Sequence, residues 1–241
     1  MKATRTMRRS IARMSTPPAL VPTTGLTVLH LFCRADVDAE HDAVADAISW
    51  ARERDCQVVL AAILGHKADC CVMALCEDAW ILRELQSRLN RAGLVAVDSY
   101  LSLTEVSEYA AGMPQELLDA RLRPSLPPAE LRAFCFYPMS KRRGDEHNWY
   151  ALDYARREEL MRGHGKVGRE FKGRVLQVIT GSTGLDDFEW GVTLFGAHLD
   201  DLKDCVYTMR FDEASANFAD FGPFYAGMIG SLDDVLTHAV A

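Results

Sequence analysis

The stretch LTVLHLFCRADVDAEHDAVADAISWARER, residues 26–54, sets the pattern from which the fold is predicted. Its opening part, Leu26–Arg34, is a run of mostly apolar residues with the composition of a strand. Asp36 and Asp38 follow, as acidic residues often do near the start of a helix. The residues at helical spacing are Val37, Val44, Ile48 and Ala51. The sequence therefore predicts a strand followed by a helix.

The rest of the first half continues this alternation. CQVVLAAIL (56–64) and DCCVMALC (69–76) predict two strands joined by a turn around Gly65. DAWILRELQSRLNRAG (78–93) places its leucines on one helix face, and LVAVDSYLSLTEVSEY (94–109) predicts a long strand. The predicted order is β-α-β-β-α-β, which is the ferredoxin-like unit.

The second half repeats this order after a proline-rich break. Four prolines in residues 113–130 rule out a long helix or a central strand there. A strand, a helix ended by Gly165, a hairpin about Gly184, a second helix and a final strand are then predicted. We therefore predict an α+β fold in which two ferredoxin-like units form a dimeric α+β barrel within one chain. The expected divisions are a disordered basic leader (1–23), an N-terminal unit (24–112), a Pro-rich connection (113–130) and a C-terminal unit (131–241).

Composition excludes some classes of function. The net charge of −7 argues against a nucleic-acid or membrane-surface binder, because such proteins usually carry an excess of cations. No segment approaches the ~18 consecutive apolar residues of a membrane-spanning helix. The seven cysteines form no C-x-x-C pair and mostly lie in apolar runs, so we expect buried thiols in a cytoplasmic protein.

The stretch FCFYPMSKRRGDEHNWY, residues 134–150, places three consecutive cations between two aromatic groups. Pro138 favours an extended Tyr137, whose ring is expected to project from a strand end into a loop-lined space. Lys141 and the two arginines after it suit a flat anionic ligand beside the aromatic rings. A solvated basic loop beside an aromatic core is the alternative.

Two further residues are candidates for a site. His164 lies near the end of a predicted helix, where its imidazole could ligate haem iron or interact with the helix dipole. Gln177 interrupts an apolar strand, so its amide either satisfies neighbouring backbone or faces a ligand cavity. No pair of histidines has the spacing of a zinc site.

Five motifs of the second half lie in order along the chain: FCFYPMSKRRGDEHNWY, LMRGHGKVGR, LQVITGSTGLDDFEWGVTLF, VYTMRFDEASA and FGPFYAG. Together they resemble the coproheme decarboxylases of the chlorite dismutase superfamily, in their Firmicutes-type sequence form. They cover most of residues 101–230 at compatible spacings. The resemblance implies a pair of ferredoxin-like units, in agreement with the duplication above, and a homopentamer.

The resemblance also implies a reaction. The enzyme would bind iron coproporphyrin III (coproheme), as both substrate and redox cofactor, and use hydrogen peroxide to convert two propionates to the vinyl groups of haem b. This is the last step of coproporphyrin-dependent haem biosynthesis, and a transient contact with the ferrochelatase that supplies coproheme is implied. A tyrosyl radical at Tyr137 would abstract hydrogen from the propionate β-carbon, and Lys141 would assist at the second propionate. His164 matches the proximal iron ligand.

The remaining site residues follow from the same resemblance. The positions that align with propionate contacts are Arg123, Lys141, Ser215 and, as a further contact, Arg169. Gln177 stands where chlorite dismutases carry a distal arginine. An amide lacks the charge to hold an oxychlorine anion, so chlorite dismutation is not predicted. Met139 matches a distal-side residue, and Trp149 matches a haem-adjacent tryptophan that we expect to pack.

Three alternatives remain open at this stage. A general haem peroxidase on the same fold would need neither Tyr137 nor Lys141. A haem carrier or sensor would keep His164 without turnover. An interaction module built from two ferredoxin-like units would leave the basic and aromatic stretch without a role.

Overall fold

The computed structural model describes residues 17–110 and 112–239. The first half follows the predicted β-α-β-β-α-β order. Its elements are β1 (Thr27–Ala35), α1 (His41–Arg52), β2 (Gln57–Ile63), β3 (Cys70–Cys76), α2 (Ala79–Arg91) and β4 (Leu94–Thr104).

The second half repeats the order with additions. Its repeated elements are β5 (Ala133–Lys141), α4 (Tyr154–Arg169), β6 (Val175–Gly181), β7 (Trp190–Gly196), α5 (Leu199–Met209) and β9 (Tyr225–Ile229). The additions are α3 (Gln115–Leu122), the 3-10 turn η1 (Trp149–Ala151), α6 (Glu213–Ala216), β8 (Ala219–Phe221) and α7 (Leu232–Ala239).

The strands close into a barrel, as predicted. In the described residues they follow the order β7-β6-β4-β1-β3-β2-β9-β5-β8, and β5 also pairs with β7. The β5–β7 ladder runs antiparallel from Ala133 opposite Gly196 to Met139 opposite Trp190. This extra ladder joins the two ends of the order into a ring, with β8 as a short extension beside β5.

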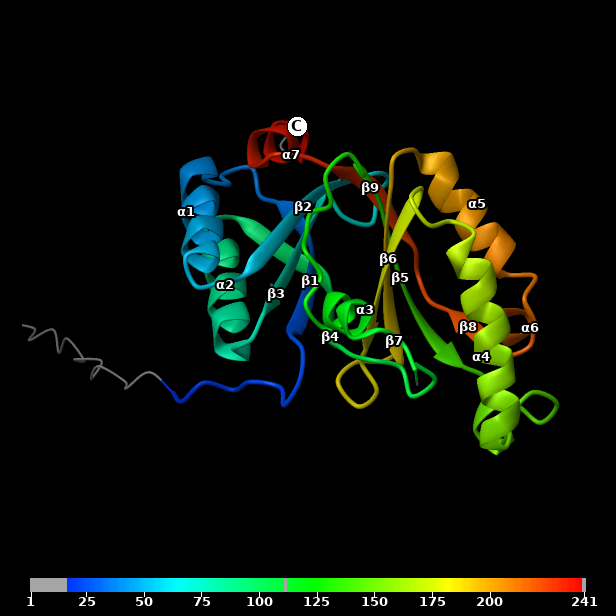
Figure 1. Ribbon diagram of the computed structural model, residues 1–241. Helices are drawn as coiled ribbons and strands as arrows, with labels where there is room; N and C mark the ends of the chain where they lie inside the picture. Colours follow the sequence, from blue (N-terminus) through cyan, green and yellow to red (C-terminus); the bar gives the residue numbers. More distant parts are fainter. Residues whose placement is uncertain (1–16, 111, 240–241) are drawn as a thin grey trace, which may run out of the picture.

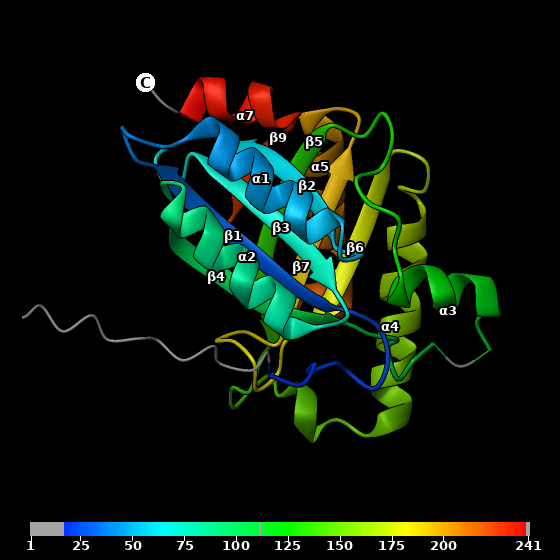
Figure 2. The ribbon, with the colours of Figure 1, turned by 90° about the vertical axis from the view of Figure 1, so that its left-hand side faces the viewer.

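Three apolar layers hold the barrel. The interior combines side chains of both halves, including Phe32, Met73, Phe136 and Phe195. Helices α1 and α2 cover the outer face of the first half, while α4, α5 and α6 lie beside the second half (Figure 1). Figure 2 shows α1 and α2 lying across β1, β2 and β3. The outer face of the first half is also covered by α7, whose Val235 and Leu236 join the apolar cluster of α1 and α2, so the last described helix packs against the first half.

Three local predictions were wrong. Val37 is 87% exposed and precedes α1, because the helix begins only at His41. Helix α4 does not end at Gly165 but continues to Arg169. Tyr137 is not at a strand end, since β5 runs on through Pro138 to Lys141. Pro138 is tolerated because it falls between the β9 ladder, which ends at Phe136, and the β8 ladder, which starts at Met139.

The predicted basic leader lies largely outside the described residues, which begin at residue 17. Within the described part, the backbone carbonyl of Leu20 accepts from Ala79 N at 2.9 Å, beside the start of α2. No helix in the described ranges has the length and apolar character needed to cross a bilayer.

An ionisable side chain is enclosed in the barrel interior. His30 on β1 is fully buried, its Nε2 lies 3.0 Å from Thr193 Oγ1, and its ring centroid is 4.3 Å from that of Phe136. Burial lowers the pKa of His30 from 6.5 to about 3. The folded protein therefore holds this imidazole neutral.

We expect His30 to make the protein sensitive to acid. The unfolded chain binds the proton more readily than the folded chain, so stability falls as the pH drops below about 6.5 and the loss is complete near pH 3. The loss is on the order of 5 kcal/mol at most. Denaturant unfolding of His30→Leu between pH 4 and 7 should show a weaker pH dependence than wild type, whereas His66→Leu, which changes an exposed histidine, should not. Parallel curves for wild type and His30→Leu would contradict this role.

Candidate functional site

The outer face of β5 carries a row of candidate side chains. Because strand residues alternate between faces, Tyr137, Met139 and Lys141 share one side, while Phe134 and Phe136 point into the barrel. Tyr137 and Lys141 are therefore roughly 13 Å apart along the strand. The row lies on the face that packs against the helices of the second half.

Tyr137 lies in an aromatic and almost dry environment. The residue is 8% exposed, and its ring stacks on Phe224 with centroids 4.5 Å apart and an interplanar angle of 25°. Phe221 contacts the same ring edge-on at 5.7 Å. Burial raises the pKa of the phenol, Cys135 and Cys205 raise it further, and Arg210 opposes them. The phenol thus keeps its proton at any physiological pH.

Lys141 is a buried cation with few partners. It is 8% exposed, its Nζ donates to the carbonyl of Ala214 at 3.2 Å, and the same Nζ lies 4.2 Å from the centre of the Trp149 ring. Burial lowers its pKa from 10.5 to about 8, against the opposing influence of Asp212 and Glu189. A bound carboxylate would give this ammonium the partner that it lacks in water-poor surroundings.

His164 on α4 is oriented by a carboxylate. Its Nδ1 lies 3.0 Å from Asp212 Oδ2 and 3.5 Å from Ser215 Oγ. Burial alone would raise the pKa of Asp212, but the hydrogen bond and charge of His164, with contributions from Ser215 and the Ala214 amide, leave it lowered. Because an ionised carboxylate only accepts, Nδ1–H donates to it, and in the neutral imidazole Nε2 keeps a free lone pair for a metal.

That free nitrogen is suited to a metal held mainly by another molecule. The His164 side chain is 31% exposed, so its ring remains reachable. Within the described ranges, no group of three or more His, Cys, Asp and Glu side chains is placed to hold an ion. Among the described residues, His164 could therefore serve as a single axial ligand to a metal that is already held by a ring of other donors, as in a metalloporphyrin.

Gln177 lies on the same face of the sheet as Tyr137, two strands away from β5. It pairs with Leu194 on β7, which in turn pairs with Cys135 on β5. Its Nε2 donates to the carbonyl of Gly168 on α4 at 3.2 Å. This neutral amide joins the sheet to the helix that carries His164, and it brings no charge to the site.

The five remaining predicted site residues differ in where they lie relative to these side chains. Ser215 and Trp149 are buried beside His164 and Lys141, and Met139 is half-buried next to β8. Arg169 is exposed near the end of α4. Arg123 is not brought to this group by any contact in the described residues, and its guanidinium pairs with Glu77 at 2.7 Å.

Sequence reasoning missed part of the site. The sequence patterns do not indicate which carboxylate supports His164; in the structure it is Asp212, while Glu213 pairs with Arg156. Sequence reasoning also missed the Ala214 carbonyl and the two phenylalanines around Tyr137. The only signal for Asp212 is its place as the N-cap of α6, where its Oδ1 accepts from Ala214 N.

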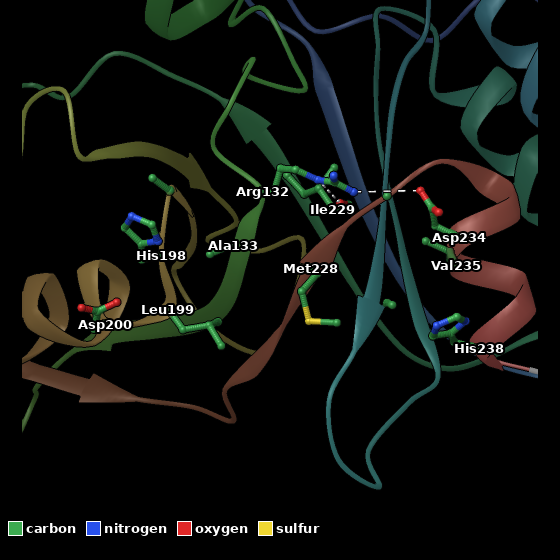
Figure 3. A pocket seen from close by; sticks show the side chains of 13 residues that line it. Arg132, Ala133, His198, Leu199, Asp200, Met228, Ile229, Asp234, Val235 and His238 are labelled. Carbon is green, nitrogen blue, oxygen red and sulfur yellow. Dashed lines mark hydrogen bonds and ion pairs between the residues drawn. The ribbon is translucent and has the colours of Figure 1, made fainter.

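A separate cavity of about 590 Å³ lies at the other end of β5 (Figure 3). It is bounded by Ala133, the start of α5 at Leu199, Met228 on β9 and Val235 on α7. Arg132 and Asp234 face each other at its rim at 3.9 Å. None of the predicted site residues lines it, so we do not assign the candidate chemistry to it.

Comparison with known proteins gives consistent matches. The family model described as Chlorite dismutase matches residues 34–230. A Staphylococcus saprophyticus protein named coproheme decarboxylase is 43% identical over 183 residues, which cover 72% of this chain and 73% of that protein. A Natronomonas pharaonis protein named for heme binding is 45% identical over 68% of this chain, and the match spans 30% of that longer protein. The solved structure of a heme-binding protein from Thermus thermophilus superposes with a TM-score of 0.80 at 33% identity, covering 93% of this chain and 98% of that one.

The buried state of Lys141 predicts a pH effect on stability. Its folded pKa of about 8 lies below the ordinary 10.5, so the unfolded chain holds the proton more tightly and wild-type stability rises between pH 8 and 10.5. The ceiling is about 3 kcal/mol. Lys141→Met should therefore be more stable than wild type at pH 7, with a difference that shrinks toward pH 10. Denaturant unfolding measures this, with exposed Lys172→Met as the control. A difference that stays constant with pH would show that the ammonium is not desolvated.

Proposed function

The chain belongs to the chlorite dismutase family, and on that premise we propose that it is a coproheme decarboxylase. It converts two propionates of iron coproporphyrin III to vinyl groups and yields haem b, with one hydrogen peroxide per propionate. Each step turns a carboxyethyl group and peroxide into a vinyl group, carbon dioxide and two waters. The likeness to the Staphylococcus saprophyticus relative over most of both chains supports this assignment.

One observation carries the proposal: the short helix α6 contacts both Lys141 and His164. The Ala214 carbonyl accepts from Lys141 Nζ, and Asp212 and Ser215 face His164 Nδ1. An axial metal ligand, a desolvated cation and, on the same strand face, a buried phenol are thus gathered around one side of the sheet. A flat metal complex with carboxylate arms matches these three kinds of group.

Tyr137 acts as the hydrogen-transfer residue in this proposal. When bound, the iron porphyrin supplies the oxidising equivalents from peroxide. The phenol can pass on an electron and a proton together, and its dry aromatic setting disfavours a charged phenolate. Phe221 and Phe224 hold the ring and exclude water from it. The abstracted hydrogen comes from the propionate β-carbon, and carbon dioxide leaves as the vinyl group forms.

Cationic side chains and one hydroxyl group position the propionates of the substrate. We assign propionate contacts to Lys141, Ser215, Arg123 and Arg169, with Lys141 serving the second propionate. Met139 and Trp149 line the porphyrin, and Gln177 lies on the distal side. Because Gln177 is neutral, it does not retain an anion over the iron, which supports decarboxylation over chlorite chemistry.

The cellular setting is part of the same proposal. Seven free thiols are typical of a reducing compartment, which supports a cytoplasmic location. We propose a homopentamer that receives coproheme from the ferrochelatase through a transient contact. A general peroxidase or a haem carrier of the same fold is the competing function.

We expect Tyr137→Phe to bind coproheme as wild type does and to lose decarboxylation by on the order of 10³-fold or more, because the hydrogen donor is gone. Purified protein is loaded with coproheme, peroxide is added stepwise, and the porphyrin is followed by mass spectrometry for one and then two losses of carbon dioxide. Tyr150→Phe, an exposed tyrosine nearby, should remain active. A general peroxidase would oxidise added dyes and leave the propionates intact in wild type and variant alike. A haem carrier would bind coproheme, and added peroxide would only bleach the porphyrin without loss of carbon dioxide.

We expect Asp212→Asn to weaken coproheme binding by about 10–100-fold, because the carboxylate that orients His164 is lost. Asparagine also caps helices, so α6 should survive the change. Absorbance titration gives the affinity, and the iron–imidazole stretching frequency of the ferrous complex reports the change at Nδ1. Glu213→Gln, on the same helix, is the matched control. An unchanged frequency in Asp212→Asn would refute the orienting role.

A further inference from the structure

Two cysteines at one end of the sheet lie opposite each other across a ladder. In the antiparallel β2–β3 pair, Gln57 is opposite Leu75. One step further, Cys56 therefore lies opposite Cys76. Directly opposed residues of antiparallel strands have Cα atoms about 4.5–5.5 Å apart, which is within the ~4.4–6.8 Å range of disulfides. Extension of the printed ladder by one residue thus brings Cys56, which directly precedes β2, and Cys76 to the backbone separation that a disulfide spans.

The two thiols differ in acidity. The pKa of Cys76 is lowered, first by the hydrogen bond from Cys56 and then by the backbone N–H groups of Asp78 and Glu77, although burial and the negative charge of Asp78 oppose them. The hydrogen bond to Cys76 and burial raise the pKa of Cys56. Cys76 also precedes α2, whose positive dipole end favours a thiolate. Cys76 is thus the more acidic of the two thiols.

The pair lies just beneath the surface. Cys56 is 4% exposed and Cys76 is 2% exposed, yet their chain neighbours Asp55 and Glu77 are both exposed. The pair is therefore one residue away from exposed positions at the end of the strand, where local opening is less costly than in the middle of a sheet.

We propose that Cys56 and Cys76 form a peroxide-oxidisable dithiol, a modification site distinct from the porphyrin site. The Cys76 thiolate attacks hydrogen peroxide, so that an S–O bond forms, the O–O bond breaks and hydroxide leaves. The Cys56 sulfur then attacks the sulfenic acid, an S–S bond forms and water leaves. In total, two thiols and one peroxide give one disulfide and two waters.

A second cysteine pair provides an internal comparison. Cys33 lies opposite Cys70 in the β1–β3 ladder, at the other end of β3. The hydrogen bond that Cys33 donates to Cys70, burial, and the charges of Cys70 and Cys71 raise the pKa of Cys33, and neither cysteine lies next to the first turn of a helix. Both pairs are opposed across an antiparallel ladder, but of these four cysteines only Cys76 lies directly before the first turn of a helix. If peroxide oxidises Cys56 and Cys76 before Cys33 and Cys70, the surroundings of the thiols decide their reactivity, and not the closeness of the two cysteines alone.

The test uses the full-length chain without porphyrin, so that its outcome is independent of decarboxylation. One equivalent of hydrogen peroxide is added at pH 7.5, free thiols are alkylated, and peptides are mapped by mass spectrometry. We expect a Cys56–Cys76 cross-link that dithiothreitol reverses. In Cys56→Ala, a dimedone adduct should persist on Cys76, and Cys76→Ala should lower the rate of thiol loss at least ~10-fold. Cys33→Ala should leave the cross-link intact.

Three results would overturn the proposal. These are a Cys33–Cys70 cross-link that forms first, equal loss of all seven thiols, and a Cys76 that stays alkylatable after excess peroxide. Thermal melting of each alanine variant before oxidation shows whether it is folded. Dimedone labelling of the wild-type chain at short times provides a readout of Cys76 that needs no substitution.

Discussion

The β5 strand is hydrogen-bonded along both edges, and the rest of the molecule depends on this pairing. On one side it forms the ladder to β7 that closes the barrel, and on the other it pairs first with β9 and then with β8. A strand fixed on both edges has one register. A slip of one residue would turn Tyr137 and Lys141 into the barrel and Phe136 out of it. The β5–β7 ladder, which closes the barrel, therefore also determines the face on which Tyr137 and Lys141 lie.

Helix α6 and its N-cap residue stabilise the buried charged groups of the candidate site. A buried ammonium and a buried carboxylate are each unfavourable without partners, and here they do not neutralise each other directly. Lys141 uses the Ala214 carbonyl and the Trp149 ring, while Asp212 uses His164 and the amide at the start of α6. The incomplete pairing of Lys141 leaves it ready for an incoming carboxylate. A fully paired lysine would have to give up a strong partner first.

Local pattern was enough to predict the order of strands and helices along the chain and its repetition in the second half, because these depend on the periodicity of neighbouring residues. It failed where distant contacts decide. Gly165 suggested a helix end, yet α4 continues, and Gly168 in its last turn lies against the Gln177 side chain, where tertiary packing outweighs the low helix propensity of glycine. The Asp212–His164 pair joins residues 48 positions apart, which no periodicity reveals.

Hydrogen bonds to the backbone of the Pro-rich connection (113–130) fix the position of Arg123 in the chain. The Gln57 side chain donates to the Pro124 carbonyl and accepts from Leu126 N, and Thr104 Oγ1 donates to the Leu122 carbonyl. Among the described residues, the Arg123 guanidinium is held by Glu77, and both partners of that ion pair are 60% exposed. An exposed pair contributes about 0–1 kcal/mol, so Glu77 restrains the Arg123 side chain only weakly. The backbone of the connection is therefore fixed while its one predicted ligand remains free to change partner.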